Sequence, residues 1–121
     1  MPFTQVISTR GALPQVANMT VTAPNQLLIV SGSAFAPAGA AGSLLVMEIL
    51  VDANVVGRCS IFANVELTHI PFVPAFIPLA LNPASSPFAV TLRPGLPTFG
   101  FGARVLAETD QNDVFEVVLI E

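Results

Sequence analysis

The sequence contains no tryptophan, no tyrosine and no lysine, and it has only one cysteine and one histidine. With Cys59 as its single cysteine, the chain cannot form a disulfide bond within itself. Four arginines supply all the positive charge and stand far apart along the chain. Because nucleic-acid binding needs clustered cations to neutralise phosphates, the sequence argues against a nucleic-acid partner.

Charged residues of either sign are also scarce. They make up 10% of the 121 residues, while hydrophobic residues make up 53%; an ordinary soluble domain is roughly a quarter charged. The length fits a single domain spanning 1–121, and a domain of this size buries only about two thirds of the surface of its unfolded chain. We therefore expect other subunits, a partner or lipid to cover part of the apolar surface.

Lipid is the weakest of these three. The stretch 67–92 contains no Asp, Glu, Lys or Arg and is long enough to cross a bilayer, but five prolines interrupt it, a density that a membrane helix does not tolerate. The opening MPFTQVISTR lacks the basic start and apolar segment of a signal peptide. We expect no membrane span and no signal peptide; a virion, a phage particle and a cell-surface assembly all stay open as locations.

Short strands are predicted throughout. No window shows the 3.6-residue period of an amphipathic helix, and eleven prolines and eight glycines divide the chain. A spacing of about ten residues with turn signals between strands favours an all-β, antiparallel sandwich or barrel. The strands are predicted at 4–8, 18–22, 26–35, 43–51, 54–62, 65–76, 88–92, 102–108 and 113–121.

Two of these strands are apolar on both faces. SLLVMEILV has Glu48 as its only charge, and the sequence DAN after it predicts a tight turn into the returning arm VVGRCSIF, where Cys59 is expected to be a small buried residue. VFEVVLIE repeats the pattern at the end of the chain. A strand that is apolar on both faces is expected to be covered twice. We therefore place the last strand in the middle of a sheet, between the core and a neighbouring subunit.

Glu48 needs a partner if it is buried, because an isolated carboxylate in a dry interior is costly. Arg58 and Arg104, on neighbouring strands, are the expected partners, either within the sheet or across subunits.

ETDQND is the polar cluster best suited to bind a ligand. Its side chains offer several hard oxygens of the kind that Ca²⁺ binds, although the spacing does not match an EF-hand; the candidate ligands are Glu108, Asp110, Asn112 and Asp113. A turn that caps a hairpin explains the same residues, and no other cofactor is expected. His69 is expected to be a hydrogen-bonded structural residue, the alternative being a metal or pH-sensing site shared by several copies on a symmetry axis.

The proline-rich stretch HIPFVPAFIPLALNPASSP predicts an edge strand or loop with exposed phenylalanines. It is a candidate contact between subunits or with a partner, the alternative being internal packing. Together with the last strand it gives the expected interface residues Phe72, Phe76, Val114, Glu116, Val118 and Ile120.

The order of these features resembles a known family. The hairpin LLVMEILVDANVVGRCSIF, the later strand SPFAVTLRPG, the segment GFGARVLAETD and the closing FEVVLIE resemble the compact jelly-roll domains of the tumour-necrosis-factor-like and C1q-like type, over about 27–121. The resemblance implies a jelly roll and a homotrimer packed around a threefold axis. Well-known members carry buried tyrosine or tryptophan, which this chain lacks, so no receptor or ligand specificity is carried over.

The sequence offers no nucleophile paired with a base, no glycine-rich phosphate loop and no zinc-ligand spacing. We therefore expect a non-enzymatic structural or assembly module that forms a homotrimer through its apolar strands. The alternative is a lectin-like module that binds a carbohydrate or a protein receptor through Asp110, Asn112 and Asp113, with or without calcium.

Overall fold

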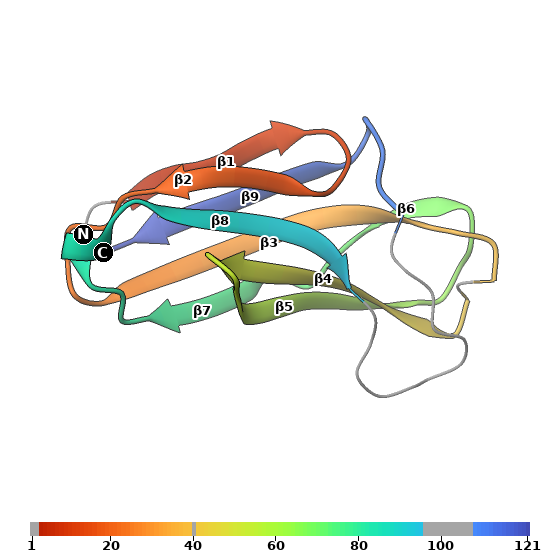
Figure 1. Ribbon diagram of the computed structural model, residues 1–121. Helices are drawn as coiled ribbons and strands as arrows, with labels where there is room; N and C mark the ends of the chain where they lie inside the picture. The colour runs from red at the N-terminus through yellow and green to blue at the C-terminus, as the bar shows by residue number, and fades with distance from the viewer. Residues whose placement is uncertain (1–2, 40, 96–107) are drawn as a thin grey trace.

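The structure, a computed structural model, describes residues 3–39, 41–95 and 108–121 (Figure 1). In this part of the chain it contains nine strands and one short 3-10 helix, η1, at Pro83–Ser85. The strands are β1 (Phe3–Arg10), β2 (Gln15–Met19), β3 (Gln26–Ala36), β4 (Ser43–Val51), β5 (Asn54–Ala63), β6 (Thr68–Pro71), β7 (Ala75–Leu79), β8 (Phe88–Gly95) and β9 (Val114–Ile120).

The strands form two antiparallel sheets that pack as a β-sandwich, as the sequence predicts. The five-stranded sheet has the order β1-β9-β3-β6, and β7 also pairs with β3; the four-stranded sheet has the order β2-β8-β4-β5. β3 is long enough to pair with β9 along one edge and with β7 and then β6 along the other. β9 lies between β1 and β3, so the prediction that the last strand is central in its sheet is confirmed (Figure 1).

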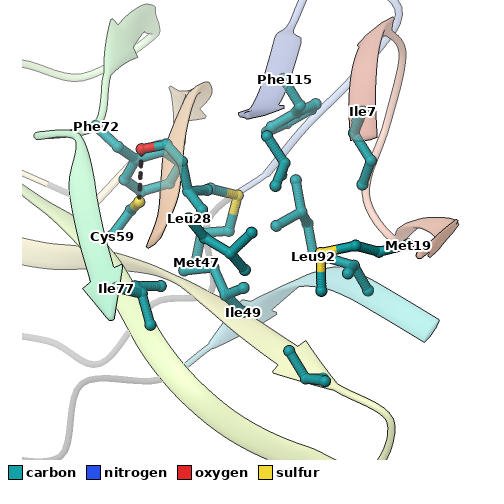
Figure 2. Packing of buried hydrophobic residues seen from close by; sticks show 14 of the residues in the cluster. Ile7, Met19, Leu28, Met47, Ile49, Cys59, Phe72, Ile77, Leu92 and Phe115 are labelled. Carbon is teal, nitrogen blue, oxygen red and sulfur yellow. Dashed lines mark hydrogen bonds between the residues drawn. The ribbon is translucent and has the colours of Figure 1, made fainter. Parts of the chain in front are cut away.

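The core fills the space between the two sheets. Every second residue of β4 points into it, from Leu45 to Val51, and Leu28 and Val30 of β3 face them from the other sheet. Figure 2 shows this interior, with Met47 and Ile49 packed near Leu28. This alternation follows from the period of two along a strand.

β4 is also covered on its other face. Val46 and Leu50 point away from the core, yet they are only 2% and 6% exposed. The prediction that this strand is covered twice is therefore confirmed at these two positions. The predicted turn after β4 is present as well: Asp52 adopts φ of 54°, a conformation that Asp tolerates better than most residues, and its carboxylate accepts a hydrogen bond from the Ala89 N–H at 2.9 Å.

The predicted strand at 65–76 is wrong in one respect, because it is divided into β6 and β7. Between them the chain turns inward: the Phe72 N–H donates to the Gly32 carbonyl at 2.9 Å, and the Phe72 side chain is 3% exposed. The expectation of an exposed Phe72 is therefore wrong, since its ring joins the core (Figure 2). Phe76, in β7, is 66% exposed as expected.

Two smaller differences concern strand ends. The strand predicted at 18–22 lies at Gln15–Met19. The strand predicted at 102–108 falls outside the described residues except for Glu108, which forms a bridge to Phe35.

None of the helices in the described ranges has the length and apolarity needed to cross a membrane.

Candidate functional site

A cluster of polar side chains lies where β9 begins. Asp113 directly precedes this strand, Ser33 comes from β3 and His69 from β6. β3 brings them together because it pairs with both other strands, with Phe35 opposite His69 and Gly32 opposite Phe115. The cluster therefore depends on contacts between segments that are far apart in the sequence.

Asp113 is the centre of this cluster and is fully buried. Its Oδ1 accepts a hydrogen bond from the Ser33 hydroxyl at 2.7 Å and lies 3.0 Å from His69 Nδ1, and its Oδ2 accepts from the Asp110 N–H at 2.9 Å. A buried carboxylate needs such donors to replace the water it has lost. Because a carboxylate can only accept, the proton in the contact with His69 belongs to Nδ1.

His69 is held on one side of its ring and accessible on the other. The Nδ1 contact with Asp113 fixes the imidazole, and the ring of Phe35 lies 5.1 Å away between centroids. The second nitrogen, Nε2, is 3.8 Å from Asp110 Oδ2. The hydrogen bond to Asp113 raises the pKa of His69 above its ordinary value; desolvation opposes the rise, and the charges of Asp113 and Asp110 add to it.

The loop before β9 is a hydrogen-bonded turn. The Asn112 N–H donates to Asp110 Oδ1 at 2.8 Å, and the Asp113 N–H donates to the Asp110 carbonyl at 3.1 Å. The predicted turn within ETDQND is therefore present; the hairpin that it was expected to cap involves 102–107, which lie outside the described residues, and calcium binding stays a prediction. Glu108 and Asn112 are exposed, and the Glu108 carbonyl accepts a hydrogen bond from the Phe35 N–H at 2.7 Å.

The order of contacts bears on what this cluster can do chemically. Nucleophilic catalysis by serine requires an imidazole against the hydroxyl and a carboxylate behind the imidazole. Here the carboxylate of Asp113 lies between Ser33 and His69, so the Ser33 hydroxyl donates its hydrogen bond to the carboxylate and not to the imidazole. The arrangement therefore does not activate Ser33 as a nucleophile.

The same side chains do form a group of metal-ligating type. His69, Asp110 and Asp113 each offer one ligand atom, and these atoms lie within 4.8 Å of one another. The sequence predicts separate roles for His69 and the ETDQND loop. Only the pairing of β6 with β3 joins them, and no spacing in the sequence signals that contact.

Glu48 lies at the centre of a second charged cluster, on the outer face of the four-stranded sheet. Its carboxylate is 3.2 Å from Arg58 on β5 and 2.9 Å from Arg93 on β8. Cross-strand register explains the contacts, because Glu48 is directly opposite both arginines. Gly95 gives the acid room, since a Cβ there would lie 2.7 Å from Glu48 Cγ.

Of the partners predicted for Glu48, Arg58 is therefore in contact with it. Arg104 lies outside the described residues. Arg93 was not predicted, although its strand is the other neighbour of β4.

Cys59, on β5, is buried as predicted, and burial raises the pKa of its thiol to about 11, so the thiol is neutral at physiological pH. Its Sγ lies 3.6 Å from the Val30 carbonyl (Figure 2).

The outer face of the five-stranded sheet carries an accessible apolar surface. Core-facing residues such as Val117 and Leu119 alternate along β9 with outward-facing Val118 and Ile120, and the register places outward residues of β1, β3 and β7 beside them. We call this surface the apolar face; its members are Phe3, Leu27, Ile29, Phe76, Pro78, Val118 and Ile120.

Exposure varies across the apolar face. Phe3 and Phe76 are 71% and 66% exposed, and the outward residues between them are half-buried. The predicted interface residues Phe76, Val118 and Ile120 thus lie together. Val114 and Glu116 lie further along the same side of β9, and Phe72 does not belong to this surface.

A groove of about 610 Å³ lies beyond the apolar face at the polar end of the same sheet. Hydroxyl and charged residues contribute to its lining, among them Ser8, Arg10, Ser31 and Glu116. Its two aromatic residues, Phe72 and Phe115, are buried in the core, so they present no open ring face for a ligand to stack on.

Comparison with known proteins does not assign the chain to a family. A scan against protein-family models found no match, and a search of curated proteins found none either.

Proposed function

We propose that this protein is a non-enzymatic assembly module that forms a homotrimer through the outer face of its five-stranded sheet. The observation that carries the proposal is the apolar face, which gathers seven apolar residues from four adjacent strands. A contiguous apolar surface that is accessible to solvent often marks an interaction site. The central members are held in a sheet, so binding a flat partner orders few side chains that were free.

A second copy of the chain is the partner that fits. Within the apolar face, β3 and β9 contribute the branched aliphatic side chains of Leu27, Ile29, Val118 and Ile120, which suit packing of identical sheets about a symmetry axis. The opposite outer face, on β4, carries the Glu48 cluster and is unsuited to dry packing. Three copies that turn this face toward a common threefold axis would close into a ring rather than extend as a filament.

The strand order supports a jelly roll and, through the resemblance to tumour-necrosis-factor-like and C1q-like domains, a trimer. The first and last strands are paired, and the chain crosses from one sheet to the other at every connection except β4 to β5 and β6 to β7, a pattern compatible with two Greek keys wrapped together. The alternative, a lectin-like module, would use the groove at the polar end. Because Phe72 and Phe115 are buried there, the geometry supports assembly better than sugar stacking.

Light scattering after size exclusion tests the proposal with a matched pair of variants. Val118→Asp places a charge in the apolar face, and Val16→Asp places the same charge on the outer face of the four-stranded sheet, where Val16 is 63% exposed. We expect the wild type and Val16→Asp to have the mass of three 12.6 kDa chains and Val118→Asp to be monomeric.

Phe76→Asp, on an accessible position of β7, provides a second disruption that leaves the central strand untouched. Circular dichroism checks that each variant retains its β-structure. A wild-type monomer at micromolar concentration, or a trimer that survives both Val118→Asp and Phe76→Asp, would overturn the proposal.

A further inference from the structure

We infer that His69 and Asp110, oriented by Asp113, form a binding site for a divalent transition-metal ion such as Zn²⁺. The inference rests on the geometry of three side chains at the start of β9 and does not depend on whether the protein forms a trimer. It also differs from the calcium site expected from the sequence, because it includes an imidazole and assigns different roles to the two aspartates.

The distances suit a small ion. Zn²⁺ binds imidazole nitrogen at about 2.0–2.1 Å and carboxylate oxygen at about 2.0–2.2 Å, so two of its ligand atoms lie roughly 3–4 Å apart. His69 Nε2 and Asp110 Oδ2 are 3.8 Å apart. An ion can therefore bridge these two atoms with side-chain adjustment alone, and both residues are accessible from solvent.

Asp113 has the contacts of an orienting group. Its Oδ1 accepts hydrogen bonds from His69 Nδ1 and the Ser33 hydroxyl, and its Oδ2 accepts one from the Asp110 N–H. A carboxylate that accepts from one imidazole nitrogen leaves the other nitrogen free to coordinate, an arrangement common behind metal-bound histidines. Asp113 also fixes the backbone of Asp110, so one buried acid positions both proposed ligands.

The local charge favours a cation. Two carboxylates lie within 4.8 Å of the imidazole, and among the described residues His69 is the only ion-pair partner recorded for either of them. A divalent ion would neutralise this excess. Imidazole nitrogen favours Zn²⁺, Cu²⁺ or Ni²⁺ over Ca²⁺, which prefers six to eight oxygens. With two protein ligands and the remaining positions left to water, the site should bind more weakly than a closed four-ligand site.

Calorimetric titration of the untagged protein with ZnCl₂ tests the inference with a matched pair. Asp110→Asn and Glu108→Gln each remove one carboxylate charge from the same short segment, but only the first removes a proposed ligand. We expect one Zn²⁺ per chain in the wild type and in Glu108→Gln, and at least a tenfold loss of affinity in Asp110→Asn and His69→Gln.

Because His69 is the only histidine, any imidazole signal has a single assignment. Pulsed EPR of the Cu²⁺-loaded wild type should show coupling to an imidazole nitrogen, and this measurement needs no variant, so it does not depend on how a variant folds. The inference is overturned by the absence of that coupling, by equal loss of Zn²⁺ in Glu108→Gln and Asp110→Asn, or by tighter binding of Ca²⁺ than of Zn²⁺.

Discussion

Glu48 and Asp113 are both acids with several donors around them, but they sit in different surroundings. Glu48 is on the outer face of a sheet between two arginines whose side chains are 45% and 47% exposed. Asp113 is fully buried, and its donors are a hydroxyl, an imidazole and a backbone N–H. Charged arginines near the surface and short polar groups in the interior are therefore alternative sources of hydrogen-bond donors for a carboxylate.

The largest expected effect is the difference between Asp113→Asn and Glu48→Gln, which both remove a charge and keep the shape. Asparagine has one acceptor oxygen for three donors and turns its own N–H₂ toward one of them. We expect Asp113→Asn to lower the free energy of unfolding by about 2–4 kcal/mol. Glu48→Gln should cost about 0–1 kcal/mol, because water screens the pairs and can solvate the freed arginines.

Urea unfolding at one fixed protein concentration measures both changes, since association would otherwise contribute to stability. Equal losses in the two variants would contradict the distinction between fully buried Asp113 and Glu48, whose side chain is 15% exposed and whose arginine partners are accessible to solvent.

The sequence predicts the Glu48 cluster better than the Asp113 cluster, and the reason is register. Alternation along β4 and the tight hairpin after it place Arg58 opposite Glu48, so that contact follows from local pattern. His69 and Asp113 are 44 residues apart and meet only because β3 pairs with both β6 and β9. No local period carries that information.

The same limit explains the error at Phe72. The prolines around Phe72 predict an edge strand or a loop, which is correct. They do not predict which way a side chain points between the end of one strand and the start of the next. The chain turns inward there because the Phe72 N–H donates a hydrogen bond to the Gly32 carbonyl, which places the Phe72 ring in the core. The sandwich was predictable from the spacing of strands and turns, and the central position of β9 from the apolar residues on both of its faces; neither depends on knowing which distant residues meet.

A smaller effect should appear with pH, on the Asp113 side of the comparison only. The pKa of His69 is raised in the folded protein by its hydrogen bond to Asp113, so the protonated form is favoured by folding. This contribution is fully present below the ordinary value of about 6.5 and is lost as the pH rises through the folded pKa. Because His69 is accessible to solvent, the effect should be modest.

We expect the urea midpoint of the wild type to fall between about pH 6 and pH 8 in metal-free buffer, and the midpoint of His69→Gln to fall less. Cys59 does not titrate in this range, since its pKa is about 11. A midpoint that rises with pH in the wild type, or an equal fall in His69→Gln, would show that the imidazole is not stabilised by Asp113.

The smallest expected effect concerns salt, and it acts on the Glu48 side. The Debye length falls from about 10 Å at 0.1 M salt to about 3 Å at 1 M, which weakens accessible ion pairs far more than buried hydrogen bonds. The stability difference between the wild type and Glu48→Gln should therefore shrink by a few tenths of a kcal/mol when NaCl is raised over this range. The difference for Asp113→Asn should change less, because the Asp113 side chain is fully buried and is screened less by salt. Urea is the suitable denaturant, since guanidinium is itself a salt. If the Glu48→Gln difference is unchanged at 1 M while that of Asp113→Asn falls, Glu48 acts through packing against Gly95 rather than through its charge, and the contrast between the two acids is reversed.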